Sequence, residues 1–340
     1  MKYTIGYQLP DEYDSTLSIC KDYKENISGV YFSYGSEPSG RLPLFFSGDE
    51  DEDEIKKFQL EELKAINSLG IPLSLLLNAN CYGEEAVSDG FKEHILTLVR
   101  FLKNEVDISA VTTTSPFVAE TLKNEFGDSL YICASVNMRV DNINTMRQLS
   151  DSFDGFYIRK ELNRNLEGIK QLHSWCSENG KKLHILANSG CLSYCGFQTF
   201  HDNLVAHQNG LADSTYLKYP APCWKYLASL PEDDMLSAIM QSNWIRPEDV
   251  WRYKDYFSEM KLATRMHSRP RMVIAAYIRE RFNGNITDLT EPSYSSLFRG
   301  KILDNTLLKD EWFDMVSKCD KNCHKCDYCK TTVQKIKIKV

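Results

Sequence analysis

The sequence lacks any long hydrophobic run. None of its 340 residues belongs to an apolar stretch of about eighteen or more, the length that a membrane-spanning helix requires. The first residues, MKYTIGYQLPDEYD, contain one lysine and no apolar segment, unlike a secretory signal. We therefore expect a cytoplasmic protein that does not associate with a membrane.

Several motifs of common enzyme classes are also missing. The chain has no Gly-rich phosphate loop, no HExxH and no GxSxG, which argues against the chemistry that each of these supports. Its net charge is −7 and its pI is near 5.6, so a broad basic surface for nucleic acid is not expected and only a local groove is left. With 26% charged and 42% hydrophobic residues, the composition is that of a soluble globular protein.

Cysteine, by contrast, is abundant. In a chain without an export signal, eleven cysteines predict reduced thiols or metal ligands and not disulfides. Seven of them form a central and a C-terminal group: Cys191, Cys195 and Cys223, and Cys319, Cys323, Cys326 and Cys329. The other four are scattered and are expected to be buried as small apolar side chains: Cys20, Cys81, Cys133 and Cys176.

The stretch from Leu183 to His207 reads LHILANSGCLSYCGFQTFHDNLVAH. It begins as an apolar strand, breaks at an Asn-Ser-Gly turn and then presents Cys191 and Cys195, followed by a helix-like segment. Barrels and open parallel sheets build their sites at the carboxyl ends of strands. The stretch therefore predicts a functional site at such an end.

Short apolar segments alternate with amphipathic segments along the chain, which indicates right-handed βα units and a parallel sheet. The expected strands are 4–7, 29–34, 72–77, 108–111, 131–135, 155–158, 183–187, 236–240 and 261–265. These are nine candidate strands, and a barrel of this type has eight, so one of them is wrong or lies outside the barrel. We predict a TIM-like (β/α)₈ barrel, regular or irregular, over residues 1–317, with a doubly wound open sheet as the alternative. Residues 318–340 are expected to be a small cysteine-rich tail that binds metal.

The tail spacing is Cys319-x3-Cys323-x2-Cys326-x2-Cys329. Structural zinc sites usually take two close pairs from separate loops. Compact runs with short gaps resemble the ligand spacing of iron–sulfur proteins. The tail therefore predicts a [4Fe-4S] cluster, with zinc as the alternative. Its first three cysteines also match the spacing of radical S-adenosylmethionine enzymes, although that motif follows an early strand of the barrel in those enzymes.

Cys191, Cys195 and Cys223 could provide three ligands of a second site. The fourth ligand of such a cluster would be His201, His207 or Cys81, or one iron would stay open to substrate. A competing interpretation makes a cysteine near His201 a nucleophile.

A basic group lies just after the last expected strand, with His267 next to three arginines: Arg265, Arg269 and Arg271. Guanidinium groups bind carboxylates and phosphates through paired hydrogen bonds. We expect Arg265 and Arg269 to anchor an anionic part of a substrate. The alternative is that these arginines form ion pairs with the surplus acidic residues.

Three longer segments and the tail form a recognisable combination. They read ANSGCLSYC…FHDN, WIRPEDVWRY and KLATRMHSRPRMVIAAYIRERFNGN. This combination resembles the collagenase-like peptidase family U-32 in its short, barrel-only form, from about Ile71 onward and most clearly from Asn188 to Asn285. The resemblance implies a TIM-like barrel with an oxygen-sensitive [4Fe-4S] cluster on four cysteines, near Cys191, Cys195 and Cys223. It also implies an activity named as proteolytic, which in better-understood relatives is oxygen-independent hydroxylation of ubiquinone precursors or of tRNA and rRNA bases.

The chain departs from that pattern in its cysteine spacing and in its own four-cysteine tail. We therefore expect an iron–sulfur enzyme with one or two clusters, in which His201, Arg265 and Arg269 act on a small-molecule or RNA-base substrate. Two alternatives stay open. One is a metal- or cysteine-dependent peptidase, and the other is a non-catalytic iron–sulfur subunit that pairs with a second protein in a homo- or heterodimer.

Overall fold

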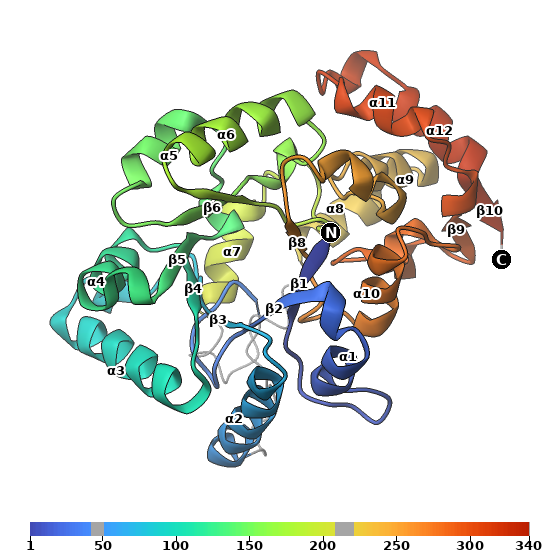
Figure 1. Ribbon diagram of the computed structural model, residues 1–340. Coiled ribbons are helices and arrows are strands. Elements are labelled where there is room, and N and C mark those ends of the chain that lie inside the picture. Colours follow the sequence, from blue (N-terminus) through green and yellow to red (C-terminus); the bar gives the residue numbers. More distant parts are fainter. Residues whose placement is uncertain (42–50, 208–220, 340) are drawn as a thin grey trace.

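The computed structural model describes residues 1–41, 51–207 and 221–339. Its central feature is a sheet of eight parallel strands in the order β7-β6-β5-β4-β3-β2-β1-β8 (Figure 1). The strands are β1 (Lys2–Gly6), β2 (Ile27–Phe32), β3 (Leu73–Leu77), β4 (Ala110–Thr113), β5 (Tyr131–Ala134), β6 (Gly155–Tyr157), β7 (Lys182–His184) and β8 (Glu259–Lys261). From β1 to β7, strands that follow one another in the sequence lie side by side, and β8 lies next to β1. This is the order of a βα barrel.

The ring closes between the segment after β7 and β8. The amide of Lys261 donates to the carbonyl of Ile185, and the amide of Ala187 donates to the carbonyl of Lys261, both at 2.9 Å. These two bonds place Leu186 beside Lys261 as a parallel bridge. The predicted TIM-like (β/α)₈ barrel is therefore confirmed, with a seam held by two hydrogen bonds.

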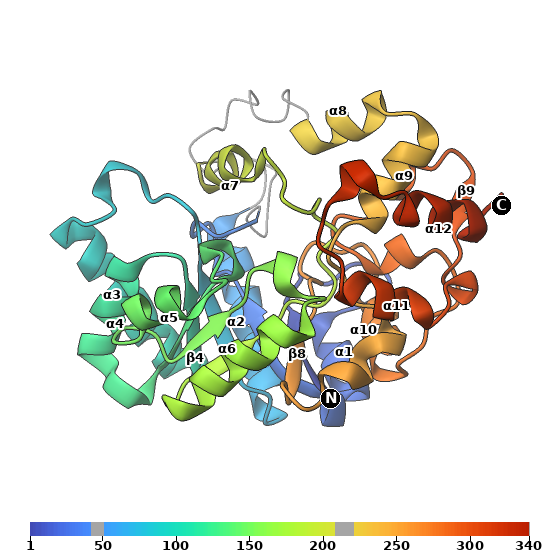
Figure 2. The ribbon, with the colours of Figure 1, turned by 90° about the horizontal axis from the view of Figure 1, so that it is seen from above.

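Helices cover the outside of the ring, and two more lie across one end of it (Figures 1 and 2). The outer helices of the first part of the chain are α1 (Thr16–Asp22), α2 (Glu52–Ser68), α3 (Asp89–Val106), α4 (Pro116–Phe126), α5 (Ile143–Leu149) and α6 (Leu166–Glu178). In Figure 2, α7 (Gln198–Ala206) and α8 (Pro222–Ser229) lie at the end opposite the N-terminus. We call this end, where the strands have their carboxyl ends, the mouth.

Local sequence explains where these helices begin. The side chain of Ser88 accepts a hydrogen bond from the amide of Phe91 at 3.1 Å, and Asn165 caps α6 through Gly168 at 2.9 Å. Such caps satisfy amides that have no partner inside the helix. The apolar faces of the capped helices then pack on the outer faces of the strands, where the core residues include Leu75, Val111 and Phe156.

One predicted strand is wrong. Residues 236–240 belong to α9 (Glu232–Met240), whose first turn carries Glu232, Asp233 and Asp234. Acidic residues at a helix N-terminus are stabilised by the helix dipole, and a short apolar run alone does not distinguish a helix from a strand. The last predicted strand, 261–265, shares only Lys261 with β8, since the strand ends there. The segment that reads WIRPEDVWRY contains a 3-10 helix, Pro247–Tyr253.

The C-terminal part packs against the barrel body. It contains α10 (Pro270–Ile278), α11 (Glu311–Ser317), α12 (Tyr328–Ile336) and an antiparallel pair of strands, β9 (Lys301–Leu303) and β10 (Lys337–Lys339). Helix α12 lies on α9, and its Val333 and Ile336 belong to the main core. The predicted boundary after residue 317 coincides with the end of α11 and stays a prediction.

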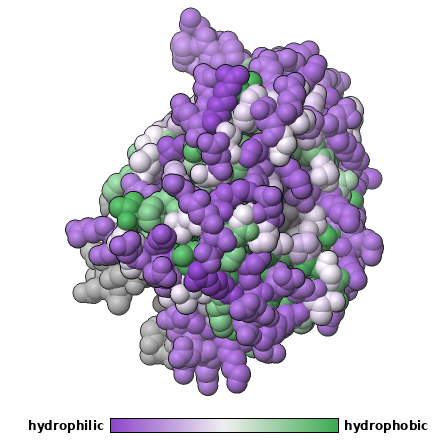
Figure 3. Space-filling model, turned by 60° about the vertical axis from the view of Figure 1, so that its left-hand side comes forward, coloured by the Kyte–Doolittle hydropathy of each residue, from purple (hydrophilic) through white to green (hydrophobic). Residues whose placement is uncertain are grey.

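The surface is mainly polar. The face drawn in Figure 3 is mostly hydrophilic, with hydrophobic side chains in small scattered groups. In the described parts of the chain, no helix combines the length and the apolar character needed to cross a bilayer.

Candidate functional site at the barrel mouth

The turn after β7 is fixed by its backbone and by one asparagine. The side-chain oxygen of Asn188 accepts from the amide of Ala263 at 2.6 Å, and its nitrogen donates to the carbonyl of Leu289 at 2.8 Å. A Cβ atom on Gly190 would lie 1.9 Å from the carbonyl oxygen of Pro292, so only glycine fits there. The turn thus joins the ends of two strands and directs the following residue, Cys191, over the mouth.

The three central cysteines share one cavity of about 240 Å³, which we call the mouth cavity. Cys191 and Cys195 come from the loop after β7, Cys223 comes from α8, and His201 reaches the same cavity from α7. Of the three residues predicted as a fourth ligand, only His201 lines it; His207 and Cys81 do not. The structure therefore brings together the ligands predicted from the Leu183–His207 stretch and the more distant Cys223.

Burial controls the ionisation of these groups. It raises the pKa of the Cys195 thiol, and the neighbouring thiolates of Cys223 and Cys191 act in the same direction. Burial also raises the pKa of Cys223, against the effect of its hydrogen bond with Tyr294. The pKa of His201 is lowered, first by burial and then by the positive charge of Arg41. Close thiols that resist ionisation in the free protein fit a site that a cation or a cluster would neutralise.

A second cavity, of about 80 Å³, continues from the mouth cavity towards the barrel axis; we call it the deep pocket. The two cavities share Arg41 and Glu291, whereas Arg265 and Lys261 line only the deep pocket. Among the residues that the structure describes, three basic side chains and one carboxylate line this small pocket. Burial lowers the pKa of Arg265 to about 10 and raises that of Glu291. This excess of positive charge suits an anion.

The predicted basic group does not act as a unit. Arg265 lines the deep pocket and donates to the Ser39 hydroxyl at 3.0 and 3.1 Å. Arg269 is 58% exposed, pairs with Asp288 at 3.0 Å and is not brought to either cavity. Arg271 forms ion pairs with Asp14 and Asp22, as the alternative interpretation predicted for it. The imidazole of His267 bonds to the backbone carbonyl of Asp288 at 2.9 Å.

The tail cysteines gather at a separate cavity of about 110 Å³, the tail cavity. Cys319, Cys323 and Cys329 line it, and the charge of Cys326 is close enough to raise the pKa of Cys323. Burial is the main reason why the pKa of Cys329 rises to about 11. The buried guanidinium of Arg164 faces the same cavity and favours the thiolate of Cys329.

One short loop, Cys191–Cys195, separates the mouth cavity from the tail cavity. Its two terminal cysteines line the first, whereas Ser193 and Tyr194 line the second. Asn243 connects this loop to the tail: it donates to the Ser193 hydroxyl at 3.0 Å and accepts from Lys321 Nζ at 3.3 Å. The two groups of cysteines are therefore neighbours across a single loop.

Cysteine ligands can hold either a single metal ion or an iron–sulfur cluster. Within residues 1–41, 51–207 and 221–339, no three or more His, Cys, Asp or Glu side chains are close enough to hold one metal ion. An iron–sulfur cluster is larger than a single ion and takes thiolate ligands around its whole surface. The three thiols that line the mouth cavity are the type of ligand that such a cluster takes.

Sequence reasoning missed Lys261, Arg41, Glu291 and Tyr294 as cavity residues. For Lys261 a signal was present, because it lies four residues before Arg265 and alternate residues of a strand face the same side. The other three lie in loops, and their approach to the cysteines depends on how the barrel closes.

Comparisons with known proteins agree with this architecture. No family model matches the chain. An uncharacterized protease of Methanocaldococcus jannaschii, MJ1657, is 27% identical over 341 aligned positions, covering 97% of this chain and 95% of that protein. The solved structure of the U32 peptidase Mk0906 superposes with a TM-score of 0.52 at 15% identity, covering 77% of this chain and 91% of that one. The sequence match to a protease and the fold match to a U32 peptidase together confirm the resemblance of this chain to the U32 peptidases.

Proposed function

We propose that the protein is an iron–sulfur-dependent barrel enzyme of the U32-like type that modifies an anionic small molecule or a nucleobase. One observation carries the proposal: the mouth cavity, lined by three cysteines, shares Arg41 and Glu291 with the arginine-lined deep pocket. A redox-active centre would thus lie next to the place where an anion binds. Hydroxylation or sulfur transfer is the reaction class that this neighbourhood suits.

Cys191, Cys195 and Cys223 would hold a [4Fe-4S] cluster, with His201 as the fourth ligand or as a group beside an open iron. When bound, the cluster would supply electrons or an iron site for sulfur or substrate. The chain's own residues do the rest. Arg41 and Arg265 bind the anionic group, and Tyr294 keeps the Cys223 side of the cavity covered by hydrogen bonding to its thiol.

The tail cysteines would hold a second cluster, with zinc as the alternative. The proposal is supported by the single loop between the tail cavity and the mouth cavity. A cluster in the tail would be well placed to pass electrons to the first. Hydrogen bonds through Ser193, Asn243 and Lys321 connect the loop between the two cavities to the tail.

A peptidase is the second candidate, because the curated relative and the matched structure carry that name. In that case a cysteine of the mouth cavity would be the nucleophile and His201 its base. The raised pKa values of Cys195 and Cys223 make those two poor nucleophiles when no metal is bound, which leaves Cys191.

The deciding measurement is iron, acid-labile sulfide and zinc per chain on protein purified without oxygen. It is made on the wild type and on Cys191→Ala, Cys326→Ala and the control Cys81→Ala, whose side chain lies outside both cysteine cavities. We expect about eight irons in the wild type and the control, and about half in each of the other two variants. Zinc without iron would overturn the proposal, and proteolysis that persists without iron but requires Cys191 would establish the peptidase.

A further inference from the structure

Lys261 lies in the middle of the barrel, where a TIM barrel usually has apolar side chains. On β8 its neighbour Met260 is fully buried among the outer core residues, so Lys261 and Glu259 face the interior. Lys261 lines the deep pocket on one side. On the other side it lines a cavity of about 300 Å³ at the amino ends of the strands, which we call the inner cavity. Lys261 therefore lies between the deep pocket, on the mouth side, and the inner cavity at the opposite end of the barrel.

The side chain of Lys261 is held by aromatic rings. Nζ lies 3.9 Å from the ring centre of Tyr31 and 4.9 Å from that of Tyr157. The Tyr31 hydroxyl is fixed by donating to the carbonyl of Leu262 at 2.8 Å. Within the described ranges, Nζ makes no hydrogen bond or ion pair, although ring faces stabilise an ammonium group to some extent. A lysine without a carboxylate partner is free to interact with a ligand in the deep pocket.

The surroundings of Lys261 bring its pKa close to neutral pH. Burial is the main cause that lowers its pKa to about 7; Arg265 and Arg41 lower it further, and the thiolate form of Cys133 opposes them. Titratable and charged groups face it from the surrounding strands and mouth loops: Tyr31, Cys133, Tyr157, His184, Glu259, Arg41 and Arg265. Near neutral pH, both the amine and the ammonium are populated.

We propose that Lys261 is a catalytic residue that exchanges a proton with an anionic substrate held by Arg41 and Arg265. This rests on the anion site of the proposed function. As an acid, Lys261 breaks one Nζ–H bond and gives the proton to the substrate oxygen, nitrogen or carbon above it, and the electron pair of that bond stays on Nζ. As a base it performs the reverse transfer. The proton is then exchanged with solvent through the inner cavity, which Lys261 also lines.

If Lys261 exchanges a proton beside a bound anion, its pKa must depend on whether the anion is bound. A negative charge in the deep pocket favours the ammonium form, so anion binding must raise the midpoint at which Lys261 loses its proton. A lysine that only fills space in the barrel interior would not couple its protonation to an anion in this way.

The test measures the rate of reductive methylation of Lys261 by mass spectrometry as a function of pH, since only the neutral amine reacts. The protein is used as isolated without oxygen. We expect a midpoint near 7, and an upward shift of about one pH unit in sulfate compared with chloride of equal ionic strength. A midpoint near the ordinary lysine value of about 10.4, or one that sulfate does not move, would overturn the proposal.

Two variants locate the effect. Arg265→Gln removes a neighbouring positive charge, so the midpoint without sulfate should rise and the sulfate shift should shrink. Arg269→Gln is the matched control, because its side chain lies outside the deep pocket, and it should change neither value. This measurement does not depend on iron content. The Lys261 proposal can therefore fail while the cluster proposal holds, and the reverse.

Discussion

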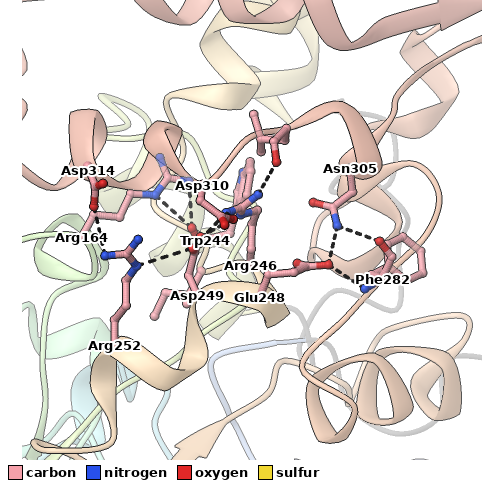
Figure 4. A network of polar contacts seen from close by, with 12 residues as sticks. Arg164, Trp244, Arg246, Glu248, Asp249, Arg252, Phe282, Asn305, Asp310 and Asp314 are labelled. Carbon is pink, nitrogen blue, oxygen red and sulfur yellow. Dashed lines mark hydrogen bonds and ion pairs between the residues drawn. The ribbon is translucent and has the colours of Figure 1, made fainter.

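Arg246 is a fully buried cation that fixes the C-terminal part of the chain to the barrel (Figure 4). It donates to both carboxylate oxygens of Asp249, at 2.8 and 3.0 Å, and to the carbonyl of Leu308 at 2.6 Å. Beside it, the Arg164 guanidinium lies 4.6 and 4.5 Å from the ring centres of Trp244 and Trp312, which stack on each other 5.2 Å apart. The Ile-Arg-Pro-Glu-Asp segment, one of the segments that resemble the U32 peptidases, therefore has a structural role here.

Removing Asp249 should be costly. In Asp249→Ala, Arg246 stays buried and keeps only the exposed carboxylate of Asp310, 3.5 Å away. We therefore expect a loss of about 3–5 kcal/mol in the free energy of unfolding, measured by urea denaturation. The control is Glu280→Gln, which breaks the surface pair with Lys254 and should cost less than about 1 kcal/mol. Equal effects of the two variants would contradict the assignment of this network. The double variant Arg246→Leu, Asp249→Leu should recover much of the loss.

At the scale of elements, α12 and β10 fold onto the barrel body through both apolar and charged contacts. Lys337 forms ion pairs with Glu232 and Asp233 in the first turn of α9, at 3.0 and 2.5 Å. Ile336 is 1% exposed and belongs to the main core. The tail therefore draws its stability from α9 as well as from any metal at its cysteines.

Ile336→Ala should lower the free energy of unfolding by about 2–4 kcal/mol, because it leaves a cavity between α12 and the barrel. The control is Ile338→Ala, two residues further along and 36% exposed, which should cost about 0.5 kcal/mol or less. Both are measured on metal-free protein by urea denaturation. A small effect of Ile336→Ala would mean that α12 is not docked when no metal is present.

Most elements of the barrel were predictable, because its short apolar strands are separated by capped amphipathic helices. Residues 236–240 were misassigned, since five apolar-rich residues fit either period and the three acidic residues before them were the better signal. The cysteines of the mouth cavity were found from their spacing. Lys261 was missed although its spacing from Arg265 was a signal. Arg41 could not be found, because it lies in a loop whose approach to the barrel axis depends on ring closure, which the local pattern does not contain.

For the whole molecule, the cysteines range from exposed to fully covered, with five of the eleven in between. The tail thiols Cys319, Cys323 and Cys326 are exposed, whereas Cys20, Cys133 and Cys176 are buried, as the sequence predicted for these three. Burial raises the pKa of Cys20 and of Cys176 to about 12, so both are protonated as well as covered. Cys81, predicted to be buried, is partly exposed instead.

In metal-free native protein, a thiol reagent should label the three exposed tail cysteines at least about a hundredfold faster than the three buried ones, which react only after opening of the fold. Site-resolved mass spectrometry measures the rates, and labelling in denaturant provides the unprotected reference. Fast labelling of Cys133 in the native protein would contradict the packing of the barrel interior. Bound metal should slow only the reactions of the tail cysteines and of the mouth cavity.

The turn at Asn188 and Gly190 has a consequence for tracing the ancestry of such barrels. Both residues are required by packing at the seam, whereas the thiols that follow line the mouth cavity, where we propose that the chemistry takes place. Selection for folding and selection for the proposed chemistry therefore act on adjacent residues of one motif. Lineages that lose the chemistry should keep Asn188 and Gly190 while Cys191 and Cys195 drift, so a search with the turn alone would collect active and inactive descendants together.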